Sequence, residues 1–490
     1  MSVALEPAGC VESTTDGTVA LFTGADIAAI TDGVLSQGSP ATAVRRLWTD
    51  SRTVRRGDLF VALTGGRFDG HRFVAEALRN GAVGALVRYG FKLPGTALLV
   101  GPGGASAGTP PVVIEVNEPL RAFQDLARAH RRRFDMPVVA VSGSNGKTTT
   151  KDMIAAILAE RFATLKTEGN LNNHIGVPQT LLRLAARHEA AVIEMGISGL
   201  GEMARLCEIA APTHGVLTNV GPTHLETLGD VRTVARAKGE MLDALPARGT
   251  AVLNADDAFY DELCARVRGR VRSFGFSRQA DVRALSVETQ GPSSTTLRVG
   301  VRGRARPFSV SLAIAGAHNV ANALAAVAAG LAVGVGEGAI RAGLARYRPA
   351  VMRSEVRRWR GVTVLNDCYN ANPASMRAAL RWLSESKGTG RAIAVLGDML
   401  ELGGEAQQAH RDIGAEAARL GMDYLLTVGA LAADIAHGAL GEGMPPDRVV
   451  TARDHGAVAE WLKGMLRKGD VMLLKGSRGV RMEGILEELG

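Results

Sequence analysis

A glycine-rich segment that contains one lysine offers the clearest chemistry in this sequence. Residues 138–150 read VVAVSGSNGKTTT, an apolar run followed by a turn-forming stretch and the start of a predicted helix. Glycines allow backbone N–H groups to surround a phosphate, and a helix N-terminus adds a favourable dipole. Lys147 would then reach the β- and γ-phosphates, and Thr148 would hold Mg²⁺. The segment therefore predicts a nucleotide-binding loop. Its predicted contacts are Gly143, Ser144, Asn145, Gly146, Lys147, Thr148 and Thr149.

The segment departs from the common phosphate-binding pattern at one position. That pattern is G-x-x-x-x-G-K-[ST], and Val141 stands where its first glycine is expected. The alternative interpretation is a glycine-rich turn with an incidental lysine. Lysine is scarce in this chain, however, with nine lysines against 48 arginines. A lysine inside a motif is therefore expected to be required by its chemistry.

Three further polar side chains follow successive predicted elements. Glu194 ends an apolar run, His224 follows the next one, and Lys238 lies on the predicted helix after that. The carboxyl ends of parallel strands open onto the crevice of an α/β sheet. Each residue could instead be an ordinary surface residue. Together with the phosphate loop and the amide-rich stretch at 167–178 (TEGNLNNHIGVP), they favour one shared site.

The elements that would position these residues alternate between strand-like and helix-like segments. The alternation runs from residue 138 to 219 and restarts near residue 363, with a run of β-like segments at 282–314 between. Such alternation is typical of parallel sheets built from βαβ units. We predict three α/β domains, the central one a P-loop ATPase domain with a mostly parallel sheet and the last one Rossmann-like. The expected boundaries are 1–110, 111–347 and 348–490, with a Gly/Pro-rich loop at 101–111.

Composition narrows the class of protein. Hydrophobic residues make up 46% and charged residues 22%, which excludes a mostly disordered chain. Aromatic residues make up only 4%, which argues against a nucleic-acid partner that stacks on rings. The first 17 residues do not resemble a secretory signal, and residues 323–336 are too few for a membrane span. We expect a cytoplasmic protein. The cysteines lack metal-like spacing and are Cys10, Cys207, Cys264 and Cys368.

Taken together, these motifs resemble the Mur ligases, ATP-dependent amide ligases of peptidoglycan precursor assembly. GSNGKTT preceded by Val141 matches the loop variant of that family. Residues 316–326 (GAHNVANALAA) resemble its adenine segment, and residues 50–73 resemble its uridine-nucleotide segment. Three later stretches resemble the family branch that uses D-alanyl-D-alanine: NDCYNANPASM at 366–376, LGDMLELG at 396–403 and LKGSRGVRME at 474–483.

The resemblance implies a reaction and a set of partners. ATP would phosphorylate the terminal carboxylate of UDP-N-acetylmuramoyl-tripeptide, and the amine of D-alanyl-D-alanine would attack the resulting acyl phosphate. The first domain would bind the uridine nucleotide, the central domain ATP, and the last domain the dipeptide while closing on ATP. A monomer is expected. The net charge of +8 would then reflect a basic cleft for two nucleotide substrates.

The resemblance also implies residue roles. Lys147 and Arg353 would stabilise the transferring phosphoryl group, while Thr148, Glu194 and His224 would hold two Mg²⁺ ions. An ammonium at Lys238 would be repelled by such ions, and the resemblance implies a carbamylated lysine there instead. The remaining implied contacts are Asn319, Asn322 and Asp367 for ATP, Ser51, Arg52 and His71 for the uridine nucleotide, and Asn172, Asn173, Asn370 and Asn372 for the substrates.

Two alternatives stay open. A folylpolyglutamate synthase belongs to the same superfamily but lacks a uridine-nucleotide domain, whereas this chain has about 110 residues before its ATPase domain. A P-loop ATPase stimulated by nucleic acid belongs to another class and predicts basic residues interleaved with aromatic ones. The low aromatic content disfavours it.

Overall fold

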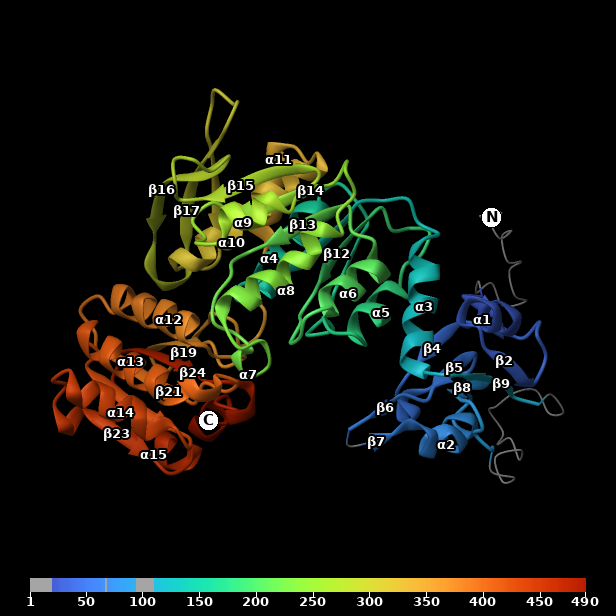
Figure 1. Cartoon of the computed structure of the whole chain (residues 1–490). Coiled ribbons are helices and arrows are strands. Elements are labelled where there is room, and N and C mark those ends of the chain that lie inside the picture. The colour runs from blue at the N-terminus through green and yellow to red at the C-terminus, as the bar shows by residue number, and fades with distance from the viewer. Residues whose placement is uncertain (1–19, 67, 94–109) are drawn as a thin grey trace. The chain divides into compact units, whose positions relative to one another are not determined.

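The computed structural model describes residues 20–66, 68–93 and 110–490, and it confirms the predicted α/β class (Figure 1). Cys10, the first 17 residues and most of the predicted loop at 101–111 lie outside the described residues. The chain divides into two compact units. The first comprises the chain up to residue 135 with residues 174–186 and 208–211, and the second comprises the remainder.

The first unit contains a five-stranded sheet in the order β2-β9-β8-β5-β4. All its pairings are parallel except that of β2 with β9. β9 lies inside the sheet and helix α3 (Pro119–Arg131) packs into the same core through Phe123 and Leu126. Residues 111–135 therefore belong with the first sheet, and not with the central domain as predicted, because the Gly/Pro-rich stretch precedes the last strand of this sheet. The strands are β2 (Val34–Gln37), β4 (Arg46–Trp48), β5 (Asp58–Val61), β8 (Gly84–Arg88) and β9 (Val112–Val116).

The second unit holds a nine-stranded sheet in the order β11-β12-β10-β13-β14-β15-β16-β17-β18. The strands from β11 to β16 are parallel, and β16, β17 and β18 form an antiparallel ribbon. Helices α4 (Lys147–Ala159) and α10 (Ala317–Val333) share one apolar core with this sheet. The strands are β10 (Val138–Ser142), β11 (Thr164–Lys166), β12 (Ala190–Glu194), β13 (His214–Leu217), β14 (Thr250–Asn254), β15 (Arg270–Gly275), β16 (Val282–Thr289), β17 (Thr295–Val301) and β18 (Phe308–Leu312).

A six-stranded sheet completes the second unit, in the order β19-β20-β24-β21-β22-β23. Only β19 runs antiparallel to its neighbour. Helices α12 (Pro373–Ser386), α13 (Ala406–Arg419) and α14 (Ala432–Gly441) fill one apolar core, while α15 (His455–Met465) and α16 (Gly484–Leu489) fill another. Separate cores on two faces define a doubly wound, Rossmann-like sheet, as predicted. The strands are β19 (Glu355–Trp359), β20 (Val362–Asn366), β21 (Ala392–Gly397), β22 (Tyr424–Val428), β23 (Val449–Ala452) and β24 (Val471–Lys475).

The two sheets of the second unit are joined by specific contacts. The indole N–H of Trp382 on α12 donates to the carbonyl of Pro292, at the turn between β16 and β17, over 3.1 Å. Among the described helices, none is both long and apolar enough to cross a membrane.

Candidate active site

The predicted phosphate loop connects β10 to α4, at the carboxyl edge of the parallel sheet. Gly143 and Gly146 have φ values of 143° and 77°, which L side chains rarely adopt. A Cβ at Gly143 would lie 1.9 Å from Thr218 Oγ1, so a larger residue does not fit there. Gly146 is the N-cap of α4 and supplies no capping side chain. The first-turn N–H groups of α4 therefore have no side-chain cap, which is the arrangement that binds an anion.

The neighbouring strand β13 holds this loop in shape. Thr218 Oγ1 donates to the carbonyl of Asn145 over 2.5 Å. Asn219 accepts the backbone N–H of Asn145 through Oδ1 at 3.0 Å and that of Ser144 through its carbonyl at 2.9 Å. Sequence reasoning missed both supporting residues. The signal that identified Glu194, a polar residue at the carboxyl end of a buried strand, applies equally to Thr218 and Asn219, which directly follow β13.

Lys147 turns back over the loop. Its Nζ donates to the carbonyl of Gly143 over 2.7 Å and to that of Ser144 over 3.3 Å. Burial lowers the pKa of Lys147, the charge of Glu194 acts in the opposite direction, and Arg353 lowers it further. A negatively charged phosphate at the loop would offset this burial cost and favour the ammonium form.

Glu194 is positioned as a cation ligand. Its side chain is 1% exposed, and Oε1 accepts from Thr148 Oγ1 over 3.2 Å and from Asn172 Nδ2 over 2.8 Å. Glu194 Oε2 is buried and has no hydrogen-bond partner among the described residues. A buried carboxylate oxygen without a partner is unfavourable, and Mg²⁺ prefers oxygen ligands. Glu194 therefore fits a magnesium ion. Thr148 is hydrogen-bonded to Glu194, and so is Asn172, which was predicted to contact substrate.

His224 lies opposite an acid that sequence reasoning missed. Its Nδ1 is 2.8 Å from Glu401 Oε2, in the loop that follows β21. The backbone of His224 is left-handed, with φ of 54°. Burial lowers the pKa of His224, Glu401 opposes that shift, and Lys238 and Lys147 reinforce it. Within the described ranges, no three His, Cys, Asp or Glu side chains gather into a metal-binding cluster.

Lys238 is an unusual buried amine. It lies on α8 (Val231–Asp243) and is 1% exposed. It makes no hydrogen bond or ion pair with any described residue. Burial lowers the pKa of Lys238 well below its ordinary value, and Lys147 lowers it further. These conditions favour a neutral amine.

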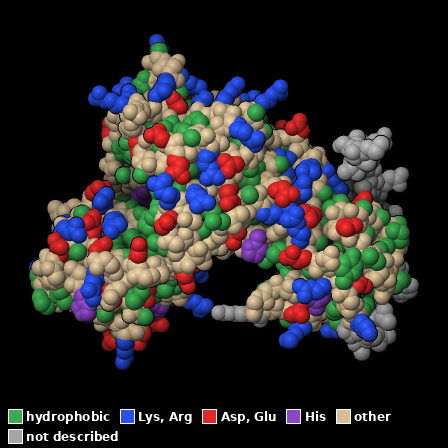
Figure 2. Space-filling model, in the orientation of Figure 1, with side chains coloured by type: hydrophobic (Ala, Val, Ile, Leu, Met, Phe, Trp, Pro, Cys, Tyr) green, Lys and Arg blue, Asp and Glu red, His purple; other side chains and the backbone are tan. Residues whose placement is uncertain are grey.

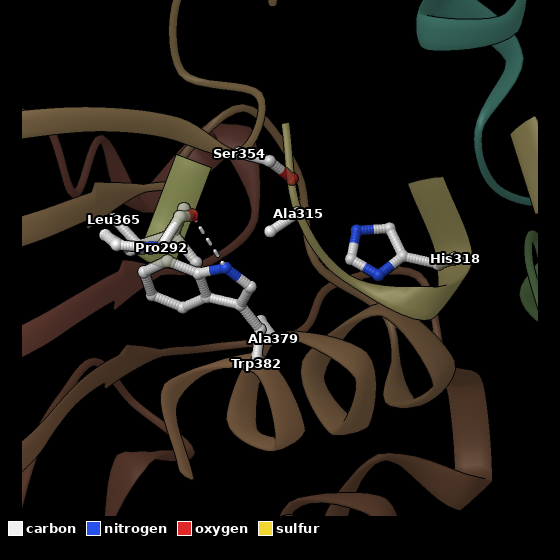
Figure 3. Close-up of a pocket in the computed structure, with 7 residues that line it drawn as sticks. All are labelled: Pro292, Ala315, His318, Ser354, Leu365, Ala379 and Trp382. Carbon is white, nitrogen blue, oxygen red and sulfur yellow. Dashed lines mark hydrogen bonds between the residues drawn. The ribbon is translucent and has the colours of Figure 1, made fainter. Parts of the chain in front are cut away.

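The predicted adenine residues lie beside a small pocket between α10 and the C-terminal sheet. Asn319 Nδ2 donates to the carbonyl of Ala315 over 2.8 Å, and Asn322 joins Asn319 to Thr150 of α4. Figure 3 shows the rings of His318 and Trp382 on opposite sides of the pocket. Neither ring was among the predicted contacts. The pocket is lined by Pro292, Ala315, His318, Ser354, Leu365, Ala379 and Trp382.

Asp367 and Arg353 lie at the start of the C-terminal sheet. Asp367 Oδ2 pairs with Lys475 Nζ at 2.5 Å, and Oδ1 accepts the backbone N–H of Ser354 at 2.8 Å. Burial opposes ionisation of Asp367, but the charge and hydrogen bond of Lys475, the Ser354 N–H and His318 together outweigh burial, so the pKa of Asp367 is lowered. The guanidinium of Arg353 stacks on the ring of Tyr369, 3.8 Å from its centre. Lys475 was not predicted as a site residue.

The asparagines predicted to meet the incoming substrate differ in their surroundings. Asn372 Oδ1 caps α12 by accepting the backbone N–H of Ser375 at 2.9 Å, and its Nδ2 donates to Asn145 Oδ1 over 2.6 Å. Asn372 therefore links α12 to the phosphate loop. Asn370 and Asn173 are exposed.

The residues predicted to bind the uridine nucleotide lie in the first unit. Ser51 is buried in a 3₁₀ turn (Ser51–Thr53). Both Arg52 Nε and Nη2 donate to the carboxylate of Asp50 at 2.9 Å, and this bonding lowers the pKa of Asp50. His71 Nε2 accepts the backbone N–H of Arg88 at 2.9 Å, so the Nδ1 proton points to Asp69, 2.7 Å away.

A phosphate loop at the carboxyl edge of a parallel sheet, followed by a Rossmann-like sheet, defines a multidomain P-loop protein. Three family profiles match the chain: "Mur ligase family, catalytic domain" over residues 44–131, "Mur ligase middle domain" over 141–330, and "Mur ligase, glutamate ligase domain" over 352–478. The chain belongs to the Mur ligase family, as its motifs predict.

Individual proteins match over nearly the whole length. The chain is 35% identical to the UDP-N-acetylmuramoyl-tripeptide–D-alanyl-D-alanine ligase of Bacillus subtilis, over 91% of this chain and 93% of that protein. A crystal structure of MurF from Acinetobacter baumannii superposes with a TM-score of 0.86 at 32% identity, covering 96% and 98% of the two chains. MurF of Thermotoga maritima, solved in complex with ADP, gives a TM-score of 0.77 at 29% identity, covering 91% and 97%.

Proposed function

We propose that this chain is an ATP-dependent, ADP-forming ligase that joins D-alanyl-D-alanine to UDP-N-acetylmuramoyl-tripeptide. The observation that carries the proposal is the arrangement of Lys147, Thr148 and Glu194 at one edge of the parallel sheet. The names and coverage of the matched relatives support the choice of substrates. We expect a monomer that works in the cytoplasm on peptidoglycan precursors.

The chemistry divides into two balanced steps. An oxygen of the tripeptide carboxylate attacks the γ-phosphorus of ATP, an acyl phosphate forms, and ADP leaves. The dipeptide amine then attacks the acyl carbon, loses a proton, and inorganic phosphate leaves from the tetrahedral intermediate. Lys147 and Arg353 would neutralise the transferring phosphoryl group, since positioning and charge stabilisation supply most of the catalysis in such transfers.

Two magnesium ions would screen the phosphate charges. Thr148 would hold the first ion, and Glu194 and His224 would hold the second. The buried Glu194 Oε2 that lacks a partner supports this assignment. Glu401 bonds to Nδ1 of His224, so His224 would contact the metal through its other ring nitrogen.

Lys238 would support the second ion as a carbamate. A neutral lysine amine combines with CO₂ to form a carbamate and releases one proton, which turns the side chain into a long carboxylate. The burial of Lys238, its lack of a described partner and its lowered pKa all favour the neutral amine that this step requires. An unmodified ammonium in the same place would repel both metal ions.

The remaining predicted residues take substrate roles in this proposal. Asn319, Asn322 and Asp367 would contact ATP, and the first unit would bind the uridine nucleotide through Ser51, Arg52 and His71. Asn370 and Asn372 of the C-terminal sheet region would bind the dipeptide. Asn172 and Asn173 would lie near the tripeptide. Side-chain amides suit a peptide ligand because they both donate and accept hydrogen bonds.

An ADP-release assay tests the proposed function. The purified chain is mixed with ATP and Mg²⁺, and UDP-N-acetylmuramoyl-tripeptide and D-alanyl-D-alanine are added separately and together. We expect sustained ADP release only when both are present, and none from Lys147→Ala. Release driven by DNA, RNA, or glutamate with a folate would contradict the proposal.

A further inference from the structure

The positive charge of this chain is concentrated in one segment. Residues 266–306 contain ten arginines and only two acidic residues, so their net charge of +8 equals that of the whole chain. The rest of the chain is balanced by formal charge. The excess therefore lies at β15 and the antiparallel ribbon of β16, β17 and β18, and not in a basic nucleotide cleft as the sequence suggested.

Several of these arginines face solvent. Arg278, Arg298, Arg304 and Arg306 are exposed, and none of them forms an ion pair or side-chain hydrogen bond with a described residue. Arg302, 63% exposed, pairs with Asp281 and donates to the carbonyl of Gln279, which draws the β17–β18 turn towards the loop before β16. Figure 2 shows Lys and Arg side chains gathered at the top of the molecule, where Figure 1 labels β15, β16 and β17.

Apolar side chains accompany the arginines on the ribbon. Leu285 and Val287 on β16 are 42% and 41% exposed, and Phe276 before it is 46% exposed. Leu297 and Val299 of β17 point into the core, so Arg298 and Gly300 occupy the opposite, outer face. Leu285 lies over Gly300, because a Cβ there would be 3.1 Å from Leu285 Cδ2. The outer face of the ribbon therefore presents a leucine beside unpaired guanidinium groups.

We infer that this ribbon surface, made of Leu285, Arg278, Arg298, Arg302, Arg304 and Arg306, binds the surface of an anionic lipid bilayer. Basic side chains near such a bilayer gain affinity from its negative potential, within a Debye length of about 10 Å at 0.1 M salt. Exposed apolar side chains add to this by entering the interface.

The spread of charge favours a bilayer over other anions. The arginines occupy separate turns and a strand face, whereas a small anion needs converging donors. A nucleic acid would gain from aromatic rings, and aromatic residues make up only 4% of this chain. A broad, uniformly negative surface matches a ribbon that carries exposed arginines on several segments with an apolar side chain between them.

Vesicle sedimentation of the full chain tests the inference. Vesicles of phosphatidylcholine alone are compared with vesicles that contain about one third phosphatidylglycerol, at low and high salt. We expect binding only to the anionic vesicles, weakened by salt. Arg304→Glu with Arg306→Glu should lower affinity at least about tenfold, because two positive charges are reversed and the net charge of the surface falls by four units. Leu285→Ser should reduce the binding that survives at high salt.

A matched double variant controls for overall charge. Arg448→Glu with Arg453→Glu replaces two exposed arginines that flank β23, and it changes the net charge by the same four units. This variant should keep vesicle affinity within about twofold of the unaltered chain. Ligand-dependent ADP release should stay unchanged in both double variants. Failure of the unaltered chain to bind anionic vesicles would overturn the inference, as would equal losses in the two variants. Tighter binding to duplex DNA or RNA than to the vesicles, lost in the ribbon variant, would also overturn it.

Discussion

Lys147 is the single residue on which the proposed phosphoryl transfer depends most. Lys147→Ala should lower turnover by at least about a hundredfold, since no other ammonium lies over the loop. Lys147→Arg should fail similarly, because a planar guanidinium does not replace a point charge held by the carbonyls of Gly143 and Ser144. Steady-state ADP release measures both variants. Near-normal turnover in Lys147→Arg would show that the loop assignment is wrong.

Lys238 offers a second residue-scale prediction. Lys238→Ala should be nearly inactive and partly rescued by acetate or propionate, which can replace the carbamate. Lys238→Arg should stay inactive, because a guanidinium cannot form a carbamate and its positive charge repels the metal ions. Mass spectrometry of the native protein should detect the added CO₂.

A second buried lysine provides the control. Lys151 is equally buried, but its Nζ donates to the carbonyl of Thr167 over 2.9 Å, so loss in Lys151→Ala should not be rescued by carboxylates. Full activity of Lys238→Arg, or of native protein in CO₂-free buffer without modification, would rule out the carbamate and leave the ligase proposal intact.

The lysines also show what residue types alone could predict. Scarcity drew attention to the motif lysines, and three of the nine lysines, Lys151, Lys238 and Lys475, are at most 2% exposed. Their partners differ, however: the carbonyl of Thr167 and the adjacent Asp152 carboxylate for Lys151, the Asp367 carboxylate for Lys475 and none described for Lys238. Thr167 and Asp367 come from segments distant in sequence from the lysines they contact, and no local pattern specifies them.

At the scale of elements, the start of α12 combines stability and function. Asn372→Ala should cost about 1 kcal/mol of unfolding free energy, because the helix cap is lost. Asn372→Ser keeps a capping oxygen and loses only the amide that reaches Asn145. It should therefore retain stability while turnover falls about tenfold, through a misplaced phosphate loop. Chemical denaturation and ADP release separate the two effects. Native turnover in Asn372→Ser would show that the amide link is dispensable.

Helix α3 should make the first unit sensitive to acid. Burial lowers the pKa of His130 to about 4, although its hydrogen bond to the carbonyl of Leu184 opposes the shift. In the unfolded chain, His130 takes up a proton below about pH 6.5. The contribution of neutral His130 to the unfolding free energy is therefore fully present above that pH and is lost as pH falls towards 4. The loss should reach about 3 kcal/mol.

Hydrogen exchange of peptides from α3, followed between pH 7 and 4.5 with correction for intrinsic rates, measures this loss. His130→Gln should reduce the pH dependence of hydrogen exchange in α3. His437→Gln, at an exposed histidine, should leave it unchanged. An unaltered pH profile in His130→Gln would contradict the assignment.

Element prediction succeeded for most of the parallel sheet. β10, β12 and β13 and the helices between them were predicted from alternation, whereas β14, although its residues are apolar, and β15 were not. β15 begins with Arg270 and Arg272, whose charges interrupt the apolar pattern. The first domain boundary was placed at the Gly/Pro-rich stretch, but that stretch precedes β9 and lies inside the first unit. Such a stretch can lie within a domain as easily as between domains.

At the scale of the whole molecule, the family and the α/β class followed from motifs, but the links between the two sheets of the second unit did not. His224 meets Glu401, and Asn145 meets Asn372, across about 180 and 230 residues of sequence respectively. These contacts depend on how two sheets pack, which local periodicity does not encode. The sequence therefore offers a set of candidate site residues, but it does not specify the contacts between them.

Oxygen transfer tests the central claim most directly, because the acyl phosphate links every residue assignment to one atom. UDP-N-acetylmuramoyl-tripeptide is labelled with ¹⁸O in its terminal carboxylate and incubated with the enzyme, ATP, Mg²⁺ and D-alanyl-D-alanine. If the carboxylate attacks the γ-phosphorus and phosphate leaves on amide formation, each molecule of inorganic phosphate carries one ¹⁸O atom and the pentapeptide product retains the other. Mass spectrometry measures the ¹⁸O content of the phosphate and of the pentapeptide product. Unlabelled phosphate accompanying pentapeptide formation, or phosphate release without pentapeptide, would contradict the account.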